Sequence, residues 1–174
     1  DERTTMGSVI SPEHLLKVES YINLAIEEGG TVLTGGTREM TGFNGSQGVG
    51  AFLRPTVVQN LPHTSRCATE EIFGPMVTLH SFTTETEALE MVNSSEYGLA
   101  GSVWTTDLER GRMFSEKMDT GIVWVNTWLH RDLRVPFGGI KDSGVGREGG
   151  MWSLGFFSEA INICVKHNDL QARV

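Results

Sequence analysis

The sequence predicts an α/β fold: an open, twisted and mainly parallel sheet with flanking helices. From residue 76 to residue 125, apolar runs of strand length alternate with helical patterns in the order strand, helix, strand, helix, strand. Such alternation is typical of parallel strands joined by right-handed crossovers. The chain also holds 21 glycines in 174 residues, and several follow the apolar run that ends at Val125. A strand that ends in a glycine-hinged loop commonly forms a site at the carboxyl edge of a sheet.

The first half of the chain opens with a predicted helix. Ser11 is a suitable N-cap and Pro12 a suitable first helical residue, and apolar residues then recur at helical spacing up to a Gly-Gly pair. Strand candidates follow at residues 31–34 and 52–58. Pro55 lies inside the second candidate, which favours an edge strand or an irregular one.

The second half carries the alternating segment. A capping box at residues 84–87 predicts a helix that runs to about Asn93. The other expected elements are strands at 76–82, 101–105 and 121–125 and helices at 107–117 and 151–157.

The end of the chain has a different pattern. Residues 160–166 alternate between apolar and polar side chains, as in a half-exposed strand. We therefore expect residues 1–158 to form the main domain, and residues 159–174 to form a strand and tail. A half-exposed strand either lies on the rim of the sheet or pairs with another subunit, and in the second case residues 160–166 would join a homo-oligomer.

Composition limits the possible partners. The chain has 22 acidic and 14 basic side chains, for a formal net charge of −8. This balance argues against nucleic acid and against an anionic membrane as partner. No apolar run is long enough to span a bilayer, and no signal-peptide pattern opens the chain. The two cysteines lie far apart, so a reduced, cytoplasmic setting is expected.

The segment Glu-Glu-Ile-Phe-Gly-Pro at residues 70–75 is one candidate site. Glu71 and Phe73 place a carboxylate and an aromatic ring two residues apart, just before a Gly-Pro turn. A carboxylate can accept hydrogen bonds from ribose hydroxyls, and a ring can pack beside a nucleotide base. The alternative is a helix end whose acids are solvated and whose phenylalanine is part of the core.

The loop after Val125 is a second candidate site. Trp128, Arg131 and Arg134 lie close together in sequence, and a guanidinium offers a planar fork that matches a carboxylate. This arrangement would suit an anionic small molecule. The alternative is that the arginines pair with neighbouring acids such as Asp132 or Glu148.

The sequence indicates no catalytic nucleophile and no protein metal site. Cys67 has His63 and Arg66 nearby, which could lower a thiol pKa, but a non-catalytic thiol is the preferred interpretation. The five histidines are scattered without the spacing of metal ligands.

A set of motifs carries a resemblance to a known family. The motifs are Glu-Glu-Ile-Phe-Gly-Pro at 70–75, Tyr-Gly-Leu-Ala at 97–100, Val-Trp-Thr at 103–105, Gly-Ile-Val-Trp-Val-Asn at 121–126, Pro-Phe-Gly-Gly at 136–139 and Ser-Gly-Val-Gly-Arg-Glu at 143–148. With these motifs, nearly the whole chain resembles the carboxyl-terminal part of an NAD(P)-dependent aldehyde dehydrogenase. The resemblance implies that the nucleophile, the base and the phosphate-binding glycines lie upstream of Asp1, so that this chain alone is expected to be inactive.

The resemblance also implies roles for residues that are present. Glu71 would bind the ribose on the nicotinamide side of NAD, and Phe73 would pack against the nicotinamide. Phe137 would line the inner part of a substrate tunnel, and residues 127–135 would form its outer wall. The last strand would join the oligomerisation sheet. The choice between NAD and NADP stays open, because the residues that meet the adenosine ribose belong to the upstream part.

The loop at residues 126–133 is similar to that of 2-aminomuconate and 2-hydroxymuconate semialdehyde dehydrogenases. Their substrates carry a carboxylate at the end opposite the aldehyde. The resemblance therefore implies Arg131 as the carboxylate clamp, with Arg134 as the second choice and Trp128 beside them. Two alternatives stay open: an inactive association module derived from this family, and a parent enzyme for a neutral or betaine-type aldehyde.

Overall fold

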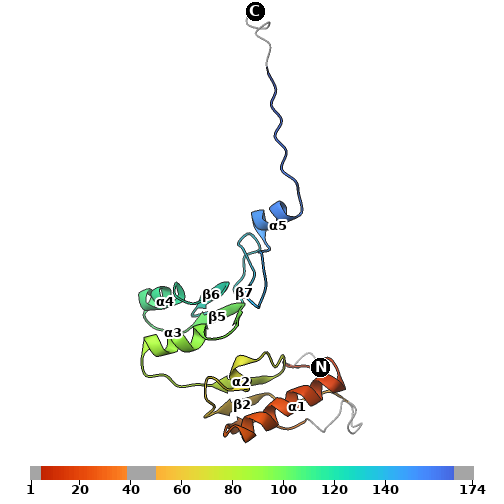
Figure 1. Ribbon diagram of the computed structural model, residues 1–174, viewed down its shortest axis with the longest axis vertical. Coiled ribbons are helices and arrows are strands. Elements are labelled where there is room, and N and C mark those ends of the chain that lie inside the picture. The colour runs from red at the N-terminus through yellow and green to blue at the C-terminus, as the bar shows by residue number, and fades with distance from the viewer. Residues whose placement is uncertain (1–4, 39–49, 167–174) are drawn as a thin grey trace, which may run out of the picture. The chain divides into compact units, whose positions relative to one another are not determined.

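The computed structural model describes residues 5–38 and 50–166, and the chain divides into two compact units, residues 1–95 and residues 96–174 (Figure 1). The part of the expected tail beyond residue 166 lies outside the described residues. Each unit has its own strands and helices.

The first unit packs helix α1 against one face of a three-stranded sheet (Figure 1). The sheet order is β1-β2-β3, with β1 antiparallel to β2 and β2 parallel to β3. The elements of this unit are α1 (Pro12–Glu27), β1 (Thr31–Thr34), β2 (Thr56–Gln59), α2 (Arg66–Thr69), β3 (Met76–Leu79) and α3 (Glu85–Asn93).

Helix α1 forms as the sequence predicts. The Ser11 side chain caps its amino end by accepting a hydrogen bond from the backbone N–H of His14 at 3.1 Å, and Pro12 occupies the first turn. The helix buries one face, which carries Leu15, Val18, Ile22 and Ala25. These residues follow the spacing of an amphipathic helix that covers a sheet.

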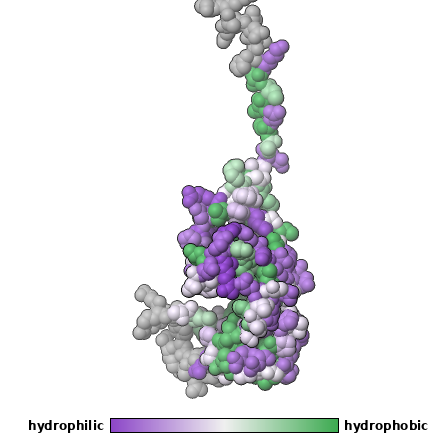
Figure 2. Space-filling model, turned by 90° about the vertical axis from the view of Figure 1, so that its left-hand side faces the viewer, coloured by the Kyte–Doolittle hydropathy of each residue, from purple (hydrophilic) through white to green (hydrophobic). Residues whose placement is uncertain are grey.

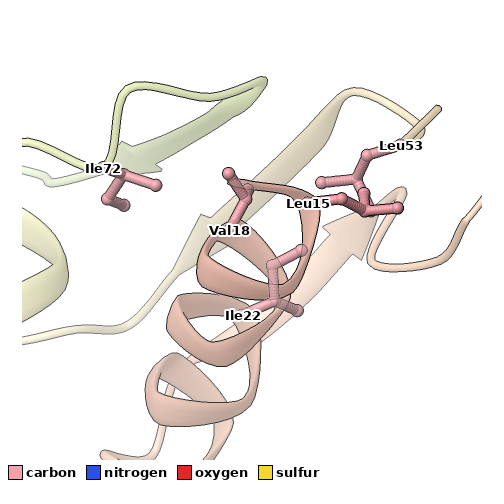
Figure 3. Packing of buried hydrophobic residues seen from close by; sticks show 5 residues of the cluster. All are labelled: Leu15, Val18, Ile22, Leu53 and Ile72. Carbon is pink, nitrogen blue, oxygen red and sulfur yellow. The ribbon is translucent and has the colours of Figure 1, made fainter. Parts of the chain in front are cut away.

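The core of the first unit reaches beyond the helix and the sheet. Leu15, Val18 and Ile22 of α1 pack with Leu53 and with Ile72, which lies in the turn that precedes β3 (Figure 3). Ile72 is only 8% exposed. The turn before β3 is therefore anchored to α1 by a buried side chain.

In the second unit, the described residues 96–166 form two pairs of strands and two helices. Strands β5 and β6 are parallel and are connected by α4, while β4 and β7 form a short antiparallel pair. The elements of this unit are β4 (Tyr97–Gly98), β5 (Ala100–Val103), α4 (Leu108–Ser115), β6 (Ile122–Val125), β7 (Ile140–Lys141) and α5 (Gly150–Phe156).

The expected α/β class is confirmed, but the expectation of one continuous parallel sheet is wrong for this chain. The alternating segment does form β3, α3, β5, α4 and β6 in the predicted order. These strands are divided among small sheets, since β3 pairs with β2 whereas β5 pairs with β6. Alternation along the chain predicts parallel pairing, but it does not say which strands become neighbours, because pairing depends on contacts distant in sequence.

The expected strand at residues 160–166 is also not formed. Residues 158–166 are neither helix nor strand, and Ile161, Ile163 and Val165 are 72–79% exposed. Figure 2 shows green, apolar side chains exposed along this segment beyond α5. A strand needs a neighbour to satisfy its backbone N–H and C=O groups, and no strand among the described residues pairs with it.

Among residues 5–38 and 50–166, no helix has the length and apolar character needed to cross a membrane.

The packing of α1 predicts a sharp difference between two adjacent leucines. Leu15 is 3% exposed and Leu16 is 58% exposed on the same helix. Replacing Leu15 with Ala leaves a cavity in the core and should lower the free energy of unfolding by about 2–5 kcal/mol. Leu16→Ala is the matched control and should change it by less than about 0.5 kcal/mol. Urea denaturation followed by circular dichroism measures both, and equal effects would contradict the described core.

Candidate functional site

The turn that links α2 to β3 carries the first candidate site. Ile72 points into the core, whereas its neighbours Glu71 and Phe73 are exposed, and the Phe73 side chain is 75% exposed. Phe73 has a φ of 62°, a left-handed conformation that is uncommon for a bulky residue. The alternative interpretation of Phe73 as a core residue is thus wrong, because the core position belongs to Ile72.

Helix α1 contacts this turn through polar side chains as well as through its core. The His14 ring nitrogen Nε2 lies 2.6 Å from the carbonyl oxygen of Phe73, and the two rings meet edge to face at 6.3 Å between centroids. Lys17 Nζ donates to the carbonyl oxygen of Glu71 at 3.3 Å. The turn is therefore held by side chains while Glu71 and Phe73 stay on the surface.

Glu70, at the start of the turn, is fixed by two donors. Arg66 Nε donates to Glu70 Oε1 at 2.7 Å, and the Tyr21 hydroxyl donates to Glu70 Oε2 at 2.5 Å. The Arg66 guanidinium, and then the Tyr21 hydroxyl, lower the pKa of the Glu70 carboxyl to about 2. Glu70 thus stays ionised and anchors the turn to α1 and α2.

The second candidate site is the loop that follows β6. Asn126 has a φ of 54°, and its side chain exchanges hydrogen bonds with the backbone of Thr105, at 2.8 and 2.7 Å. The buried Trp124 indole donates to the carbonyl oxygen of His130 at 2.8 Å, and Trp128 packs edge to face on Trp124 with centroids 4.9 Å apart. The end of β6 therefore folds this loop back on itself.

Arg131 and Phe137 lie in direct contact in this unit. The guanidinium carbon of Arg131 stands 4.1 Å from the centroid of the Phe137 ring, within the range of a cation–π interaction. Arg131 also forms an ion pair with Glu148. Phe137 and Glu148 exchange two backbone hydrogen bonds of 2.8 Å, which keep the ring and the carboxylate side by side.

Arg134 has a different environment from Arg131. It is 87% exposed and pairs with Asp132, two residues away, with Nε at 2.9 Å from Oδ1. The Arg134 guanidinium, together with its backbone N–H, lowers the pKa of the Asp132 carboxyl. Both arginines therefore form the ion pairs with neighbouring acids that the alternative interpretation expects. Of the two, Arg131 also lies against an aromatic ring, that of Phe137.

The remaining candidates of the sequence analysis show no reactive arrangement. Cys67 is buried, its thiol lies 3.3 Å from the carbonyl oxygen of Tyr21, and burial raises its pKa. Such a thiol packs rather than reacts. In the part of the chain that the structure describes, no group of three or more His, Cys, Asp or Glu side chains is arranged to hold a metal ion.

The structure thus brings the candidate residues together in two local groups. Glu71 and Phe73 share one turn of the first unit, and Arg131 and Phe137 share one contact in the second unit. Sequence reasoning did not identify the side chains of α1 that hold the turn. The one feature of the sequence that could have indicated them is their spacing, which places them along one face of the helix.

Comparison with known proteins decides the family. The sequence model that represents the aldehyde dehydrogenase family matches residues 1–163 of this chain. The chain belongs to the aldehyde dehydrogenase family. A 2-aminomuconic 6-semialdehyde dehydrogenase from Pseudomonas sp. is 48% identical over 163 residues, which are 94% of this chain and 33% of that protein. The 2-hydroxymuconic semialdehyde dehydrogenase from Pseudomonas sp. (strain CF600) is 44% identical over 171 residues, 95% of this chain and 34% of that protein.

Solved structures of aldehyde dehydrogenases also match. A crystal structure of betaine aldehyde dehydrogenase from Staphylococcus aureus in complex with NAD+ has a TM-score of 0.83 and 41% identity, covering 90% of this chain and 30% of that one. The chain spans about a third of the length of the relatives that it matches.

The contacts of Glu70 predict an unusual titration. Its carboxyl should titrate near pH 2 rather than near 4.5, as measured from the side-chain carbonyl carbon by NMR. Arg66→Gln should raise this pKa more than Tyr21→Phe does, because the guanidinium is the stronger of the two donors. A lowered acid pKa stabilises the fold above pH 4.5, and this contribution is lost as the pH falls through about 2. A wild-type pKa near 4.5 would contradict the contacts.

Proposed function

We propose that this chain is the carboxyl-terminal part of an NAD-dependent aldehyde dehydrogenase that oxidises a carboxylated, muconate-type semialdehyde to the acid. The observation that carries the substrate class is the Arg131 guanidinium lying on the ring of Phe137. The sequence identity of 48% to a 2-aminomuconic 6-semialdehyde dehydrogenase supports the same class of substrate. We refer below to the full-length protein as the parent enzyme.

Arg131 acts in this proposal as the clamp for the substrate carboxylate. A guanidinium can bind a carboxylate through two parallel hydrogen bonds, which fixes the orientation of the bound molecule as well as its position. The Phe137 ring supports one face of the guanidinium and limits its rotation. Trp128, packed on Trp124, contributes an aromatic wall in the same loop, and Arg134 is the second choice for the clamp.

Glu71 and Phe73 act in this proposal on the cofactor. Both side chains are exposed on a turn whose backbone is tied to α1, so they fit the ribose hydroxyls and the nicotinamide ring of NAD. Bound NAD supplies the hydride acceptor of the reaction. The same two residues would serve NADP, whose extra phosphate lies on the adenosine side.

The catalytic residues lie outside these 174 residues in this proposal. A cysteine thiolate of the parent enzyme would attack the aldehyde carbon, and loss of a hydride from that carbon to the acceptor that NAD would supply would leave a thioester. Water would then hydrolyse the thioester to the acid and the free thiol. The described chain contributes the binding groups for both reactants. Residues 1–158 belong to the catalytic domain, residues 160–166 join a partner subunit in the homo-oligomer, and the parent enzyme acts in the cytoplasm.

A second candidate is a parent enzyme for a neutral or betaine-type aldehyde. Two observations favour it: the ion pair between Arg131 and Glu148, and the sequence identity of 41% to a betaine aldehyde dehydrogenase. In that case Arg131 is neutralised by Glu148 and has no role in substrate choice.

A third candidate, an inactive association module, is favoured by the exposed apolar side chains of Ile161, Ile163 and Val165. A reading frame upstream of Asp1 that encodes the catalytic cysteine would exclude the module.

The clamp predicts a selective loss of substrate affinity. Arg131→Ala in the parent enzyme should raise KM for a carboxylated semialdehyde roughly 10- to 100-fold, since a charge-assisted hydrogen bond is lost. KM for an uncharged aldehyde of similar length should change little. Steady-state kinetics with both substrates measures the difference.

Arg134→Ala is the matched control for the clamp. This arginine lies three residues further along the same loop and is paired with Asp132, so its loss should leave both KM values close to those of the wild type. Equal effects of Arg131→Ala on the two aldehydes would favour the neutral-substrate candidate. A selective effect of Arg134→Ala alone would move the clamp to that residue.

The proposed division of labour predicts that the 174-residue chain has no dehydrogenase activity. Purified chain with NAD and a muconate-type semialdehyde should produce no NADH above the background rate, because the nucleophile is absent. Absorbance at the NADH maximum follows the reaction. A sustained NADH signal would contradict the assignment of the catalytic groups to the rest of the parent enzyme.

A further inference from the structure

The polar side chains of α1 that face the turn before β3 form a continuous stripe. We propose that this stripe, and His14 in particular, is a positioning element that fixes the backbone of the turn in the shape that presents Glu71 and Phe73 to a nicotinamide nucleotide. The inference rests on the proposed cofactor role of that turn. His14 itself is a positioning residue and acts through Phe73.

The spacing of the stripe matches the path of the turn. His14, Lys17 and Tyr21 lie at positions i, i+3 and i+7, which bring them to one side of a helix. They contact Phe73, Glu71 and Glu70 in that order. The turn therefore runs antiparallel to the helix and is held at three successive places.

Two of the three contacts go to backbone carbonyls. His14 and Lys17 approach the carbonyl oxygens of Phe73 and Glu71, so they leave the carboxylate of Glu71 and the ring of Phe73 available at the surface. A carbonyl oxygen only accepts hydrogen bonds, so His14 Nε2 carries the proton in this contact. The hydrogen bonds of the stripe to Phe73 and Glu71 thus act on the backbone, and of the two recognition side chains only the Phe73 ring is met, by the ring of His14.

The conformation of Phe73 explains why the turn needs such support. A bulky residue at φ 62° is unfavourable by itself and persists only where surrounding contacts determine it. Strained backbone of this kind is concentrated at ligand sites. His14 donates its hydrogen bond to the carbonyl oxygen of the strained residue itself, at 2.6 Å, and the two rings meet edge to face.

An apolar anchor on the same side of the helix completes the support. Ile72 is buried against α1, and Gly74 lies so close that a Cβ atom there would stand 2.5 Å from Val18 Cγ2. The residues on both sides of Phe73 are therefore packed against α1, and His14 contacts Phe73 itself. A bound nucleotide would therefore meet a turn that is already in the required shape, which lowers the cost of ordering on binding.

The test compares two substitutions of His14 in the parent enzyme. His14→Leu fills a similar space but donates no hydrogen bond, and it should weaken NAD binding about three- to tenfold, because the turn samples other conformations. His14→Gln keeps an amide donor at a similar reach and should restore most of the affinity. His63→Leu, an exposed histidine of the same unit, is the control and should bind NAD like the wild type. Isothermal titration calorimetry gives the dissociation constants.

A second readout on the 174-residue chain separates this inference from the proposed function. Backbone amide exchange at Ile72 and Phe73, followed by NMR, should speed up in His14→Leu and recover in His14→Gln. Wild-type parent enzyme that does not bind NAD would overturn the proposed function and leave the exchange data to test the turn. NAD binding that is equal in wild type and His14→Leu would overturn the positioning role. A loss of NAD affinity in His14→Gln as large as that in His14→Leu would also overturn the positioning role.

Discussion

The close approach of the turn at Gly74 to helix α1 is the constraint on which the first unit depends. A Cβ atom at this position would overlap the Val18 side chain, so only glycine lets the two segments meet. Their contact allows Ile72 to enter the core, and the burial of Ile72 directs its two neighbours outward. The exposure of Glu71 and Phe73 is therefore a consequence of core packing. Successive side chains of the turn point to opposite sides, so the burial of Ile72 leaves its two neighbours at the surface.

In the second unit, backbone pairing positions the side chains of the candidate site. The two hydrogen bonds between Phe137 and Glu148 bring together the ends of a ten-residue glycine-containing loop. Close approaches at Gly121, where a Cβ atom would overlap the carbonyl of Gly138, and at Gly149, beside the carbonyl of Val135, hold that pairing in place. Arg131 then lies between an aromatic face and a carboxylate, which is an arrangement suited to an anion that competes with or joins Glu148.

The sequence predicted what depends on local pattern. The cap at Ser11, the capping box at Thr84 and the helical spacing of Leu15 and Val18 each specify structure within a few residues, and those helices form as expected. Strand neighbours were not predictable, because pairing joins segments that are far apart in the chain. The segment at residues 160–166 shows the same limit, since an alternating pattern does not supply the second strand that it needs. The motifs located the two candidate sites, whereas the contacts of His14 with Phe73 and of Arg131 with Phe137 required the folded chain.

We infer that the turn carrying Glu71 and Phe73 has its shape before any nucleotide binds, because its contacts with α1 hold it. The most direct test is the backbone conformation of Phe73 in solution, from NMR scalar couplings and cross-correlated relaxation, with and without NAD. We expect a left-handed φ for Phe73 in the free protein that stays unchanged when NAD is added. Averaged couplings in the free protein, or an extended conformation that becomes left-handed only with NAD, would contradict it.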